Sequence, residues 1–215
     1  MRRVYIYVVT RDFGFAPNPF HGCCTLAACK PQIRKKARVD DWVIGMGGSR
    51  LKAIGRCVYA MRVTATLSFN DYWASEEYFD KRPVRNGSSL MMVGDNIYHR
   101  DQADNSWHQA DSHHSNPDGS ANLLNLAKDT GTDRVLLSRD FFYFGRTAPA
   151  VPAGLLEQLG FRNLRSHRVI EHPRCAEVLR WLTTECGEAR NVVAGDPFDF
   201  DHTARRYSGK GNSLQ

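Results

Sequence analysis

The chain has 215 residues, 42% of them hydrophobic, and carries a net charge of +6. A chain of this size and composition can bury a proper core, and no apolar run reaches the roughly 20 residues needed to span a bilayer, which excludes a helical membrane protein. The apolar run at residues 4–9 is also too short for a signal peptide, so we expect a cytoplasmic protein with no membrane partner.

The positive charge is concentrated in the first third of the chain. Residues 1–66 hold 12 Lys and Arg against three Asp, whereas the remaining residues hold 17 basic and 20 acidic side chains. A basic cluster follows Cys29, and Lys30 and Arg34 share a face if this segment is helical. Such a patch suits a phosphate backbone, so we predict phosphate binding by Lys30, Arg34 and Lys35. A solvated helix face is the alternative.

Hydrophobic periodicity and turn residues predict the following elements. In chain order we expect a strand at 4–10, a Pro- and Gly-rich loop at 12–22, a short helix from Thr25 towards Ala37, and strands at 42–46 and 55–65. Then follow a helix at 69–79 capped by Ser68 or Asn70, a polar loop at 94–115, strands at 134–138 and 141–144, and helices at 154–159 and 175–186.

Several short strands with only brief helices between them favour an α+β fold. We expect a small mixed or antiparallel β-barrel with peripheral helices and a C-terminal helix. We assign residues 1–150 to this domain, 151–195 to a helical extension packed on it, and 196–215 to a flexible tail. The chain has no GxGxxG, P-loop, GxSxG or HExxH motif, which argues against P-loop enzymes and the common hydrolases.

The six cysteines do not form a disulfide framework, because two are adjacent and the others fall at irregular spacings. Cys24 and Cys29 have no second pair to complete a structural zinc site. We therefore expect reduced thiols that behave as small core residues, with no metal and no cofactor.

The segment GDNIYHRDQADNSWHQADSHHS at 94–115 has the composition of a binding or catalytic site. It holds four of the eight histidines beside carboxylates, amides and amphipathic aromatic side chains. His99, His113 and His114 offer a facial metal site with Asp95 or Asp111. Adjacent histidines rarely bind one ion, so hydrogen bonds to loop carbonyls or phosphate are the favoured alternative.

Five blocks in this order resemble the second nucleotide-modification-associated domain family: GFAPNPF at 14–20, TLAACKPQIRKKA at 25–37, DDWVIGMGG at 40–48, GDNIYH at 94–99 and DSHHS at 111–115, closed by DRVLLSRDFFYFG at 133–145. The resemblance covers roughly residues 1–150, most of the chain, and implies a link to modified nucleotides in DNA-modification and phage systems. More distantly, DDWVIGMGG is similar to the PUA, ASCH and EVE barrels, although Asp40 and Asp41 stand where those folds usually show glycine.

The second likeness implies a PUA-like barrel, similar to EVE domains, that holds a flipped or single-stranded base between aromatic walls. Asn18 and Asn96 can present a donor and an acceptor to a base edge, and Asp95 can accept from an exocyclic amine. The predicted base pocket consists of Asn18, Phe20, Trp73, Asp95, Asn96, Tyr98, His99, Trp107, His113 and Tyr143.

Our first hypothesis is a non-enzymatic reader that binds nucleic acid, DNA rather than RNA, or a nucleotide, and recognises a modified base. The alternative is an enzyme that acts on a modified nucleotide or base, with Asp95 and His99 as acid and base and His113 or His114 as partner. A third hypothesis is an interaction module whose basic face docks an acidic protein. Neither the modification nor the oligomeric state follows from the sequence.

Overall fold

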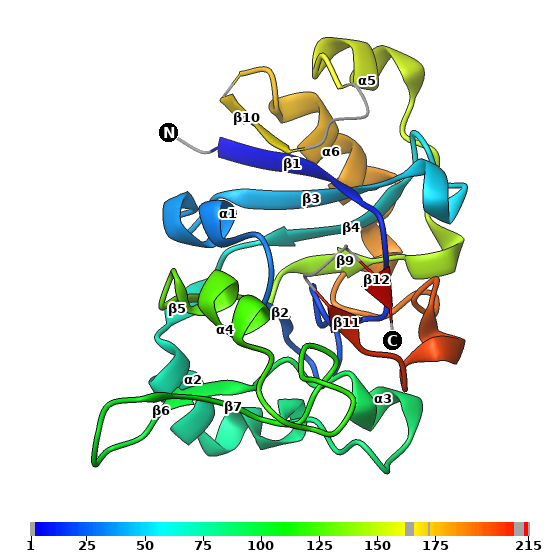
Figure 1. Cartoon of the computed structure of the whole chain (residues 1–215). Helices are drawn as coiled ribbons and strands as arrows, with labels where there is room; N and C mark the ends of the chain where they lie inside the picture. Colours follow the sequence, from blue (N-terminus) through cyan, green and yellow to red (C-terminus); the bar gives the residue numbers. More distant parts are fainter. Residues whose placement is uncertain (1–2, 162–165, 172, 209–212, 215) are drawn as a thin grey trace.

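The computed structural model describes residues 3–161, 166–171, 173–208 and 213–214. Its largest sheet has the strand order β10-β1-β3-β4-β9 and occupies the upper part of Figure 1. The strands are β1 (Arg3–Val9), β3 (Trp42–Gly47), β4 (Cys57–Arg62), β9 (Phe141–Tyr143) and β10 (His167–Glu171). β1 and β3 run parallel, and every other neighbouring pair is antiparallel.

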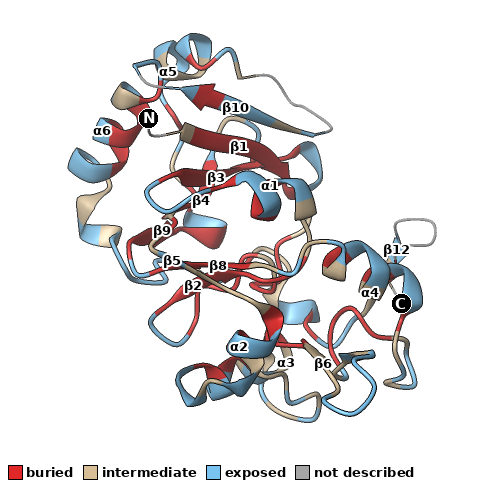
Figure 2. Ribbon diagram, turned by 90° about the vertical axis from the view of Figure 1, so that its left-hand side faces the viewer, coloured by how far each residue is buried: buried red, intermediate tan, exposed pale blue. Residues whose placement is uncertain are grey.

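Helices cover both faces of this sheet. α1 (Pro31–Lys36) lies on one face and α6 (Ala176–Thr184) on the other, as both ribbon views show (Figures 1 and 2). Strands β1 and β3 are therefore buried on both sides, which explains their nearly continuous apolar sequences. The parallel pairing also requires a crossover between β1 and β3, and the chain makes it through β2 (Cys24–Leu26) and α1.

A second, antiparallel sheet has the order β2-β8-β5, with β8 at Val135–Ser138 and β5 at Ala65–Leu67. Two further antiparallel pairs join β6 (Tyr98–Arg100) to β7 (Trp107–Gln109) and β11 (Tyr207–Ser208) to β12 (Ser213–Leu214). The α+β class is confirmed. The described strands form open sheets, however, and the largest ends at β10 and β9, so the PUA-like barrel is not confirmed.

The remaining helices are short. They are α2 (Phe69–Ala74), α3 (Ser89–Met92), α4 (Leu123–Thr130) and α5 (Ala153–Gln158), with 3-10 turns η1 (Ser49–Leu51), η2 (Glu76–Lys81), η3 (Gly145–Thr147), η4 (Gly187–Ala189) and η5 (Phe200–His202). Ser68 caps α2 as predicted, because its hydroxyl accepts the backbone N–H of Asp71. In the described part of the chain, no helix is both long and apolar enough to cross a membrane.

The helix predicted from Thr25 is wrong in its first half. Thr25 pairs with Leu137 in β2-β8, and the helix begins only at Pro31. Cys29 and Lys30 adopt left-handed backbone angles, with φ of 60° and 41°, and two such residues prevent a continuous helix. Strand and helix are thus separated by a sharp turn, which presents Cys29.

Two further segments differ from the predicted organisation. β10, in the segment assigned to a helical extension, belongs to the main sheet and pairs with β1. Part of the predicted flexible tail, residues 196–208, packs on the rest of the chain: Thr203 and Ser208 are buried, and Asp199 accepts the backbone N–H of Asp12 at 3.0 Å. This segment therefore forms part of the folded body.

Candidate active site

A cleft of about 380 Å³ opens beside the end of β1. Its walls come from β1 and the residues that follow it, from residues 29–33 at the start of α1, from His113 and His114, and from Lys128 and Tyr207. A volume of this size is typical of a small-molecule site. Of the predicted site residues, Lys30, His113 and His114 line it.

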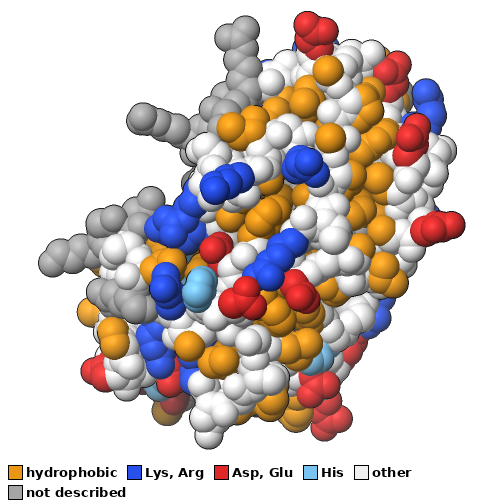
Figure 3. Space-filling view, turned by 90° about the vertical axis from the view of Figure 1, so that its right-hand side faces the viewer, with side chains coloured by type: hydrophobic (Ala, Val, Ile, Leu, Met, Phe, Trp, Pro, Cys, Tyr) orange, Lys and Arg blue, Asp and Glu red, His pale blue; other side chains and the backbone are white. Residues whose placement is uncertain are grey.

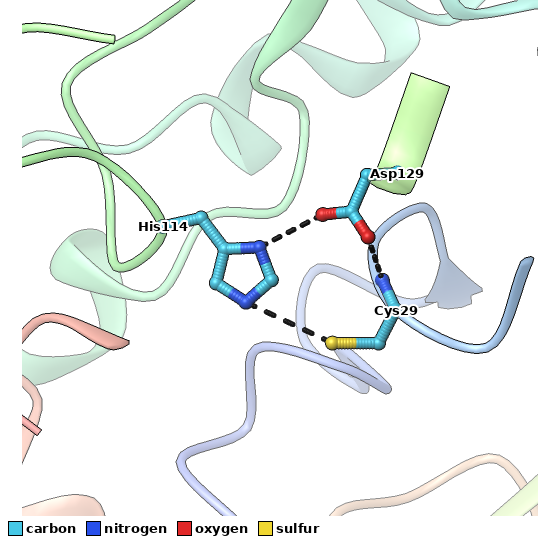
Figure 4. Close-up of side chains that lie close together, drawn as sticks. All are labelled: Cys29, His114 and Asp129. Atoms are coloured by element: carbon cyan, nitrogen blue, oxygen red, sulfur yellow. Dashed lines mark hydrogen bonds and ion pairs between the residues drawn. The ribbon is translucent and has the colours of Figure 1, made fainter. Parts of the chain in front are cut away.

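Cys29, His114 and Asp129 form a connected group at this cleft (Figure 4). The Nε2 atom of His114 lies 3.7 Å from Cys29 Sγ, and its Nδ1 lies 2.8 Å from Asp129 Oδ2. The other carboxylate oxygen of Asp129 accepts the backbone N–H of Cys29 at 2.8 Å. The imidazole therefore lies between a thiol and a carboxylate, as in the cysteine variant of a nucleophile-base-acid triad.

The same three residues are the group of described side chains that can hold a metal ion, since one donor atom from each lies within 4.8 Å of the others. Thiolate, imidazole and carboxylate are ligands that suit zinc. His114, however, directs one ring nitrogen at the sulfur and the other at the carboxylate. A ring placed in this way can hold the thiol proton on one nitrogen while the carboxylate orients it through the other, whereas a metal site needs the donors to converge on one point.

The group's electrostatics favour a protonated His114. Burial acts to lower the pKa of His114, but Coulombic attraction to Cys29 and Asp129 and the hydrogen bonds to both raise it to about 10. Burial acts to raise the pKa of Asp129, and the charge and hydrogen bond of His114 bring it below its usual value. The imidazolium therefore directs its Nε2–H at Cys29 Sγ and stabilises the thiolate, which is the nucleophilic form.

A buried arginine fixes the geometry of this group. Arg34 donates from Nε to the carbonyl oxygen of Cys29 at 2.9 Å and from Nη2 to that of Asp129. Its Nη1 donates to the carbonyl oxygens of Thr132 and Arg134 at 2.8 and 2.7 Å. Because its side chain is fully buried, Arg34 cannot bind phosphate, and its predicted role is wrong. It instead links the turn that carries Cys29 to the end of α4.

Three further side chains hold His114 and Asp129. Tyr98 donates its hydroxyl to Asp129 Oδ2 at 2.9 Å. Gln109 and Asn125 each donate an amide N–H to the backbone oxygen of His114, at 3.1 and 2.8 Å. Tyr98 was predicted to stack on a base, but it is fully buried and positions the carboxylate.

His113 lines the cleft beside His114 but has the opposite protonation state. Its Nδ1 lies 2.6 Å from the carbonyl oxygen of Arg205 and so carries the proton. Burial and the neighbouring His114 lower its pKa to about 3, which keeps the ring neutral. Its ring lies 4.4 Å from that of Phe13 and 5.3 Å from that of Phe15. His113 and His114 lie in a turn, and both line the cleft.

Asp95 and Asn18 lie in a buried network outside the cleft lining. Asp95 accepts the hydroxyls of Thr25 at 2.6 Å and Tyr72 at 2.7 Å, and Lys81 donates to Asn18 Oδ1 at 2.8 Å. Burial raises the pKa of Asp95, against the attraction of Lys81. With both side chains buried and bonded inside the protein, neither can read a base edge or act on a substrate here.

Three other predicted pocket residues are also core residues. Asn96 donates to the backbone oxygens of Tyr72 and Tyr78, and Tyr143 donates its hydroxyl to Asp12. Asn96, Tyr143 and Phe20 are all buried. Tyr143 and Phe20 belong to the hydrophobic core, and none of the three residues lines the cleft.

The half-buried residues Trp73, His99 and Trp107 lie outside the cleft lining. Trp73 and His99 stack with centroids 4.3 Å apart, and His108 continues the stack at 5.2 Å. Trp107 packs edge-on against Phe69 at 5.7 Å. The predicted pocket is therefore divided between core, cleft and this aromatic surface. Lys35 is exposed on α1, also outside the cleft lining.

The sequence interpretation missed Cys29 and Asp129 as site residues. Cys29 was treated as a core thiol, and Asp129 lies in α4, which was not predicted. One local feature could have indicated Cys29: it lies two residues before Pro31, the proline at which a helix begins. Nothing local marks Asp129, because its role depends on a histidine 15 residues earlier.

A comparison with protein-family profiles matches residues 1–204 to nucleotide modification associated domain 2. The chain belongs to this family. The match runs from β1 through η5, so it includes Cys29, His114 and Asp129 as well as the segment after residue 150. Comparisons with curated proteins and with solved structures found no match. The membership links the chain to nucleotide modification systems and leaves the reaction to be argued from the cleft.

Proposed function

We propose that this family member is an enzyme that modifies or processes nucleotides through a covalent bond to Cys29. The observation that carries the proposal is the placement of His114 between Cys29 Sγ and Asp129 at the wall of a cleft. Thiol nucleophiles need an adjacent base, and the base needs a third group to orient it. Both conditions are met here.

The proposed chemistry follows from these contacts. In the resting site the proton of the Cys29 thiol resides on His114 Nε2, and the thiolate attacks an electrophilic atom of the substrate. Asp129 holds the ring and stabilises the imidazolium. As the bond from the attacked atom to the leaving group breaks, the protonated His114 gives its proton to that group. The neutral His114 then takes a proton from water, whose oxygen attacks the same atom and displaces the Cys29 thiolate.

Recognition of a modified base in DNA is the second candidate function. The half-exposed stack of Trp73, His99 and His108 supports it, since aromatic rings of this kind can stack on an unpaired base. The cleft supports the enzyme more strongly because it combines a nucleophile, a base and room for a ligand.

The enzyme proposal predicts an unusually reactive Cys29. Alkylation by iodoacetamide, followed by peptide mass analysis, should label Cys29 at about pH 6 at least about 10-fold faster than the half-buried Cys186. Burial raises the pKa of Cys186, which makes it a suitable internal reference. The His114→Gln variant should lose most of this difference, because the thiol then has no base.

Two controls complete the test. The Cys186→Ala variant should leave the labelling of Cys29 unchanged, and metal analysis of the purified protein should find no stoichiometric ion. If Cys29 reacts no faster than Cys186 and His114→Gln changes nothing, the nucleophile assignment is wrong. A tightly bound zinc that protects Cys29 would assign the group to a metal site instead.

A further inference from the structure

The charge of the cleft is of one sign. Its described lining includes Arg11, Lys30 and Lys128 but no Asp or Glu, and the protonated His114 adds to their charge. Asp129 contacts the far side of the His114 ring and is not among the lining residues. By contrast, the outer face shown in Figure 3 mixes Lys and Arg with Asp and Glu. A concave site whose charged side chains are all cationic raises the local concentration of anions.

Lys30 directly follows the proposed nucleophile, Cys29, in the chain. Its Nζ lies 4.2 Å from the centre of the Tyr7 ring. Burial lowers the pKa of Lys30, and Lys128 lowers it further, while Cys29 acts in the opposite direction. No carboxylate is among these influences. A partly desolvated ammonium group beside a second ammonium group is stabilised when an anion binds between them.

Aromatic side chains also line the cleft. Phe13 and Phe15 line it, and the Phe15 ring lies 4.7 Å from that of His114. His114 in turn contacts Cys29, which precedes Lys30 in the chain. Along this series of contacts, Cys29 connects Lys30 to His114 and Phe15. A ligand that contacts both Lys30 and Phe15 in the cleft therefore lies close to Cys29.

We propose that the cleft binds one nucleotide, with its phosphate at Lys30 and Lys128 and its base at Phe13 and Phe15. This inference rests on the proposed function and names its substrate class. A phosphate satisfies the cations, and a planar base packs on aromatic rings. The volume of about 380 Å³ suits a single nucleotide unit, either free or as one residue of a strand.

The first experiment measures binding to the full-length protein by calorimetry. The probes are the four common deoxynucleoside 5′-monophosphates and the matching nucleosides. At least one nucleotide should bind about 10-fold or more tightly than its nucleoside. Lys30→Met and Lys128→Met should each remove most of this preference. Lys35→Met, which removes an exposed lysine of α1 outside the cleft lining, should leave it unchanged.

A second experiment distinguishes binding of a free nucleotide from binding of one nucleotide within a strand. A free nucleotide gives a shallow dependence of affinity on salt, whereas a single-stranded oligonucleotide with several phosphate contacts gives a steep one. Either result supports the inference if Lys30→Met weakens binding and Lys35→Met does not. Equal affinity for nucleotide and nucleoside, or equal effects of the two variants, would overturn it.

Iodoacetamide labelling separates this inference from the proposed function. If Cys29 reacts rapidly but no nucleotide binds or protects it, the assignment of Cys29 as a nucleophile stands and the nucleotide subsite is rejected. If nucleotides bind through Lys30 while Cys29 is unreactive, the subsite stands and the covalent chemistry is rejected.

Discussion

Two adjacent histidines show how strongly surroundings control a residue's chemistry. His113 packs against Phe13 and Phe15, and burial lowers its pKa to about 3. His114 contacts Cys29 and Asp129, and its pKa is raised to about 10 in spite of burial. At neutral pH the cleft therefore presents one neutral and one charged imidazole. The sequence does not predict this difference in pKa, since the two side chains are chemically identical.

Acid is expected to destabilise the protein through His113. In the unfolded chain this residue takes up a proton near its ordinary pKa of 6.5, whereas in the folded protein it does so only near pH 3. The unfolded state thus binds the additional proton, and stability falls as the pH drops from about 6.5 towards 3. The free energy of unfolding, measured in urea at about pH 7.5 and about pH 5, should decrease more for the wild type than for His113→Gln.

Asp12 acts against this trend, because burial raises its pKa to about 6 and its ionised form is unfavourable in the folded protein. Since Asp12 is present in both the wild type and His113→Gln, the difference between their decreases in stability reports on His113 alone. An equal decrease in the two proteins would show that His113 is not the acid-sensitive group.

At the scale of single elements, the turn between β2 and α1 carries the site. β2 is fixed by pairing with β8, and α1 is fixed by Arg34, which bonds to backbone oxygens near the end of α4. Between them Cys29 and Lys30 are held in left-handed conformations, which are unfavourable for residues with a side chain. Strain of this kind persists where the surrounding structure determines it, and it is frequent at active sites.

Replacement of Arg34 by methionine should both destabilise the protein and disturb the site. The variant leaves buried carbonyl oxygens without a donor, including that of Cys29, and we expect a loss of about 2–4 kcal/mol. Urea denaturation measures this loss, and iodoacetamide labelling should show a slower Cys29. Lys35→Met, at the next and exposed position, should change neither quantity. Unchanged stability in Arg34→Met would refute the structural role.

Gly45 tests the packing of the main sheet. A Cβ atom there would lie 2.3 Å from a ring carbon of Tyr59, whereas one at Gly154 would meet nothing within 4 Å. Gly45→Ala should therefore lower the free energy of unfolding by about 1–3 kcal/mol. Gly154→Ala, in α5, should leave it unchanged or raise it slightly. Thermal or urea denaturation checks both, and similar values for the two variants would contradict the tight fit at Tyr59.

At the scale of the whole molecule, the C-terminal segment closes one wall of the cleft. Tyr207 donates its backbone N–H to the carbonyl oxygen of His113 at 2.7 Å, and its ring lies 5.5 Å from that of His114. Arg206 pairs with Asp111. Arg206 and Tyr207 thus support the histidines in the middle of the sequence.

Removal of residues 196–215 is therefore expected to affect both stability and the site. The shortened protein should have a lower Tm, since it loses the contacts of Asp199, Arg206 and Tyr207. Iodoacetamide should label Cys29 with a different pH dependence, because His114 becomes more exposed. If Tm and labelling are the same as in the full chain, the segment is a dispensable tail, as its composition predicts.

Much of the fold follows from local sequence patterns. The apolar runs at β1, β3, β8 and β9 predict strands because burial on a sheet requires them. β10 was missed since four of its five residues are exposed or half-buried, so it lacks an apolar run. The helix predicted from Thr25 failed because strand pairing and two left-handed residues override local helix propensity.

By itself, the sequence determined the α+β class, the main strands and the resemblance to the nucleotide modification associated family, because these depend on composition, local period and motif order. Only the tertiary structure decided which residues form the site. Cys29 meets His114 across 85 residues of chain, and His114 meets Asp129 across 15. Arg34 has the same sequence signature as the exposed lysines beside it, yet it is buried. Contacts between distant segments are set by packing, which no local pattern records.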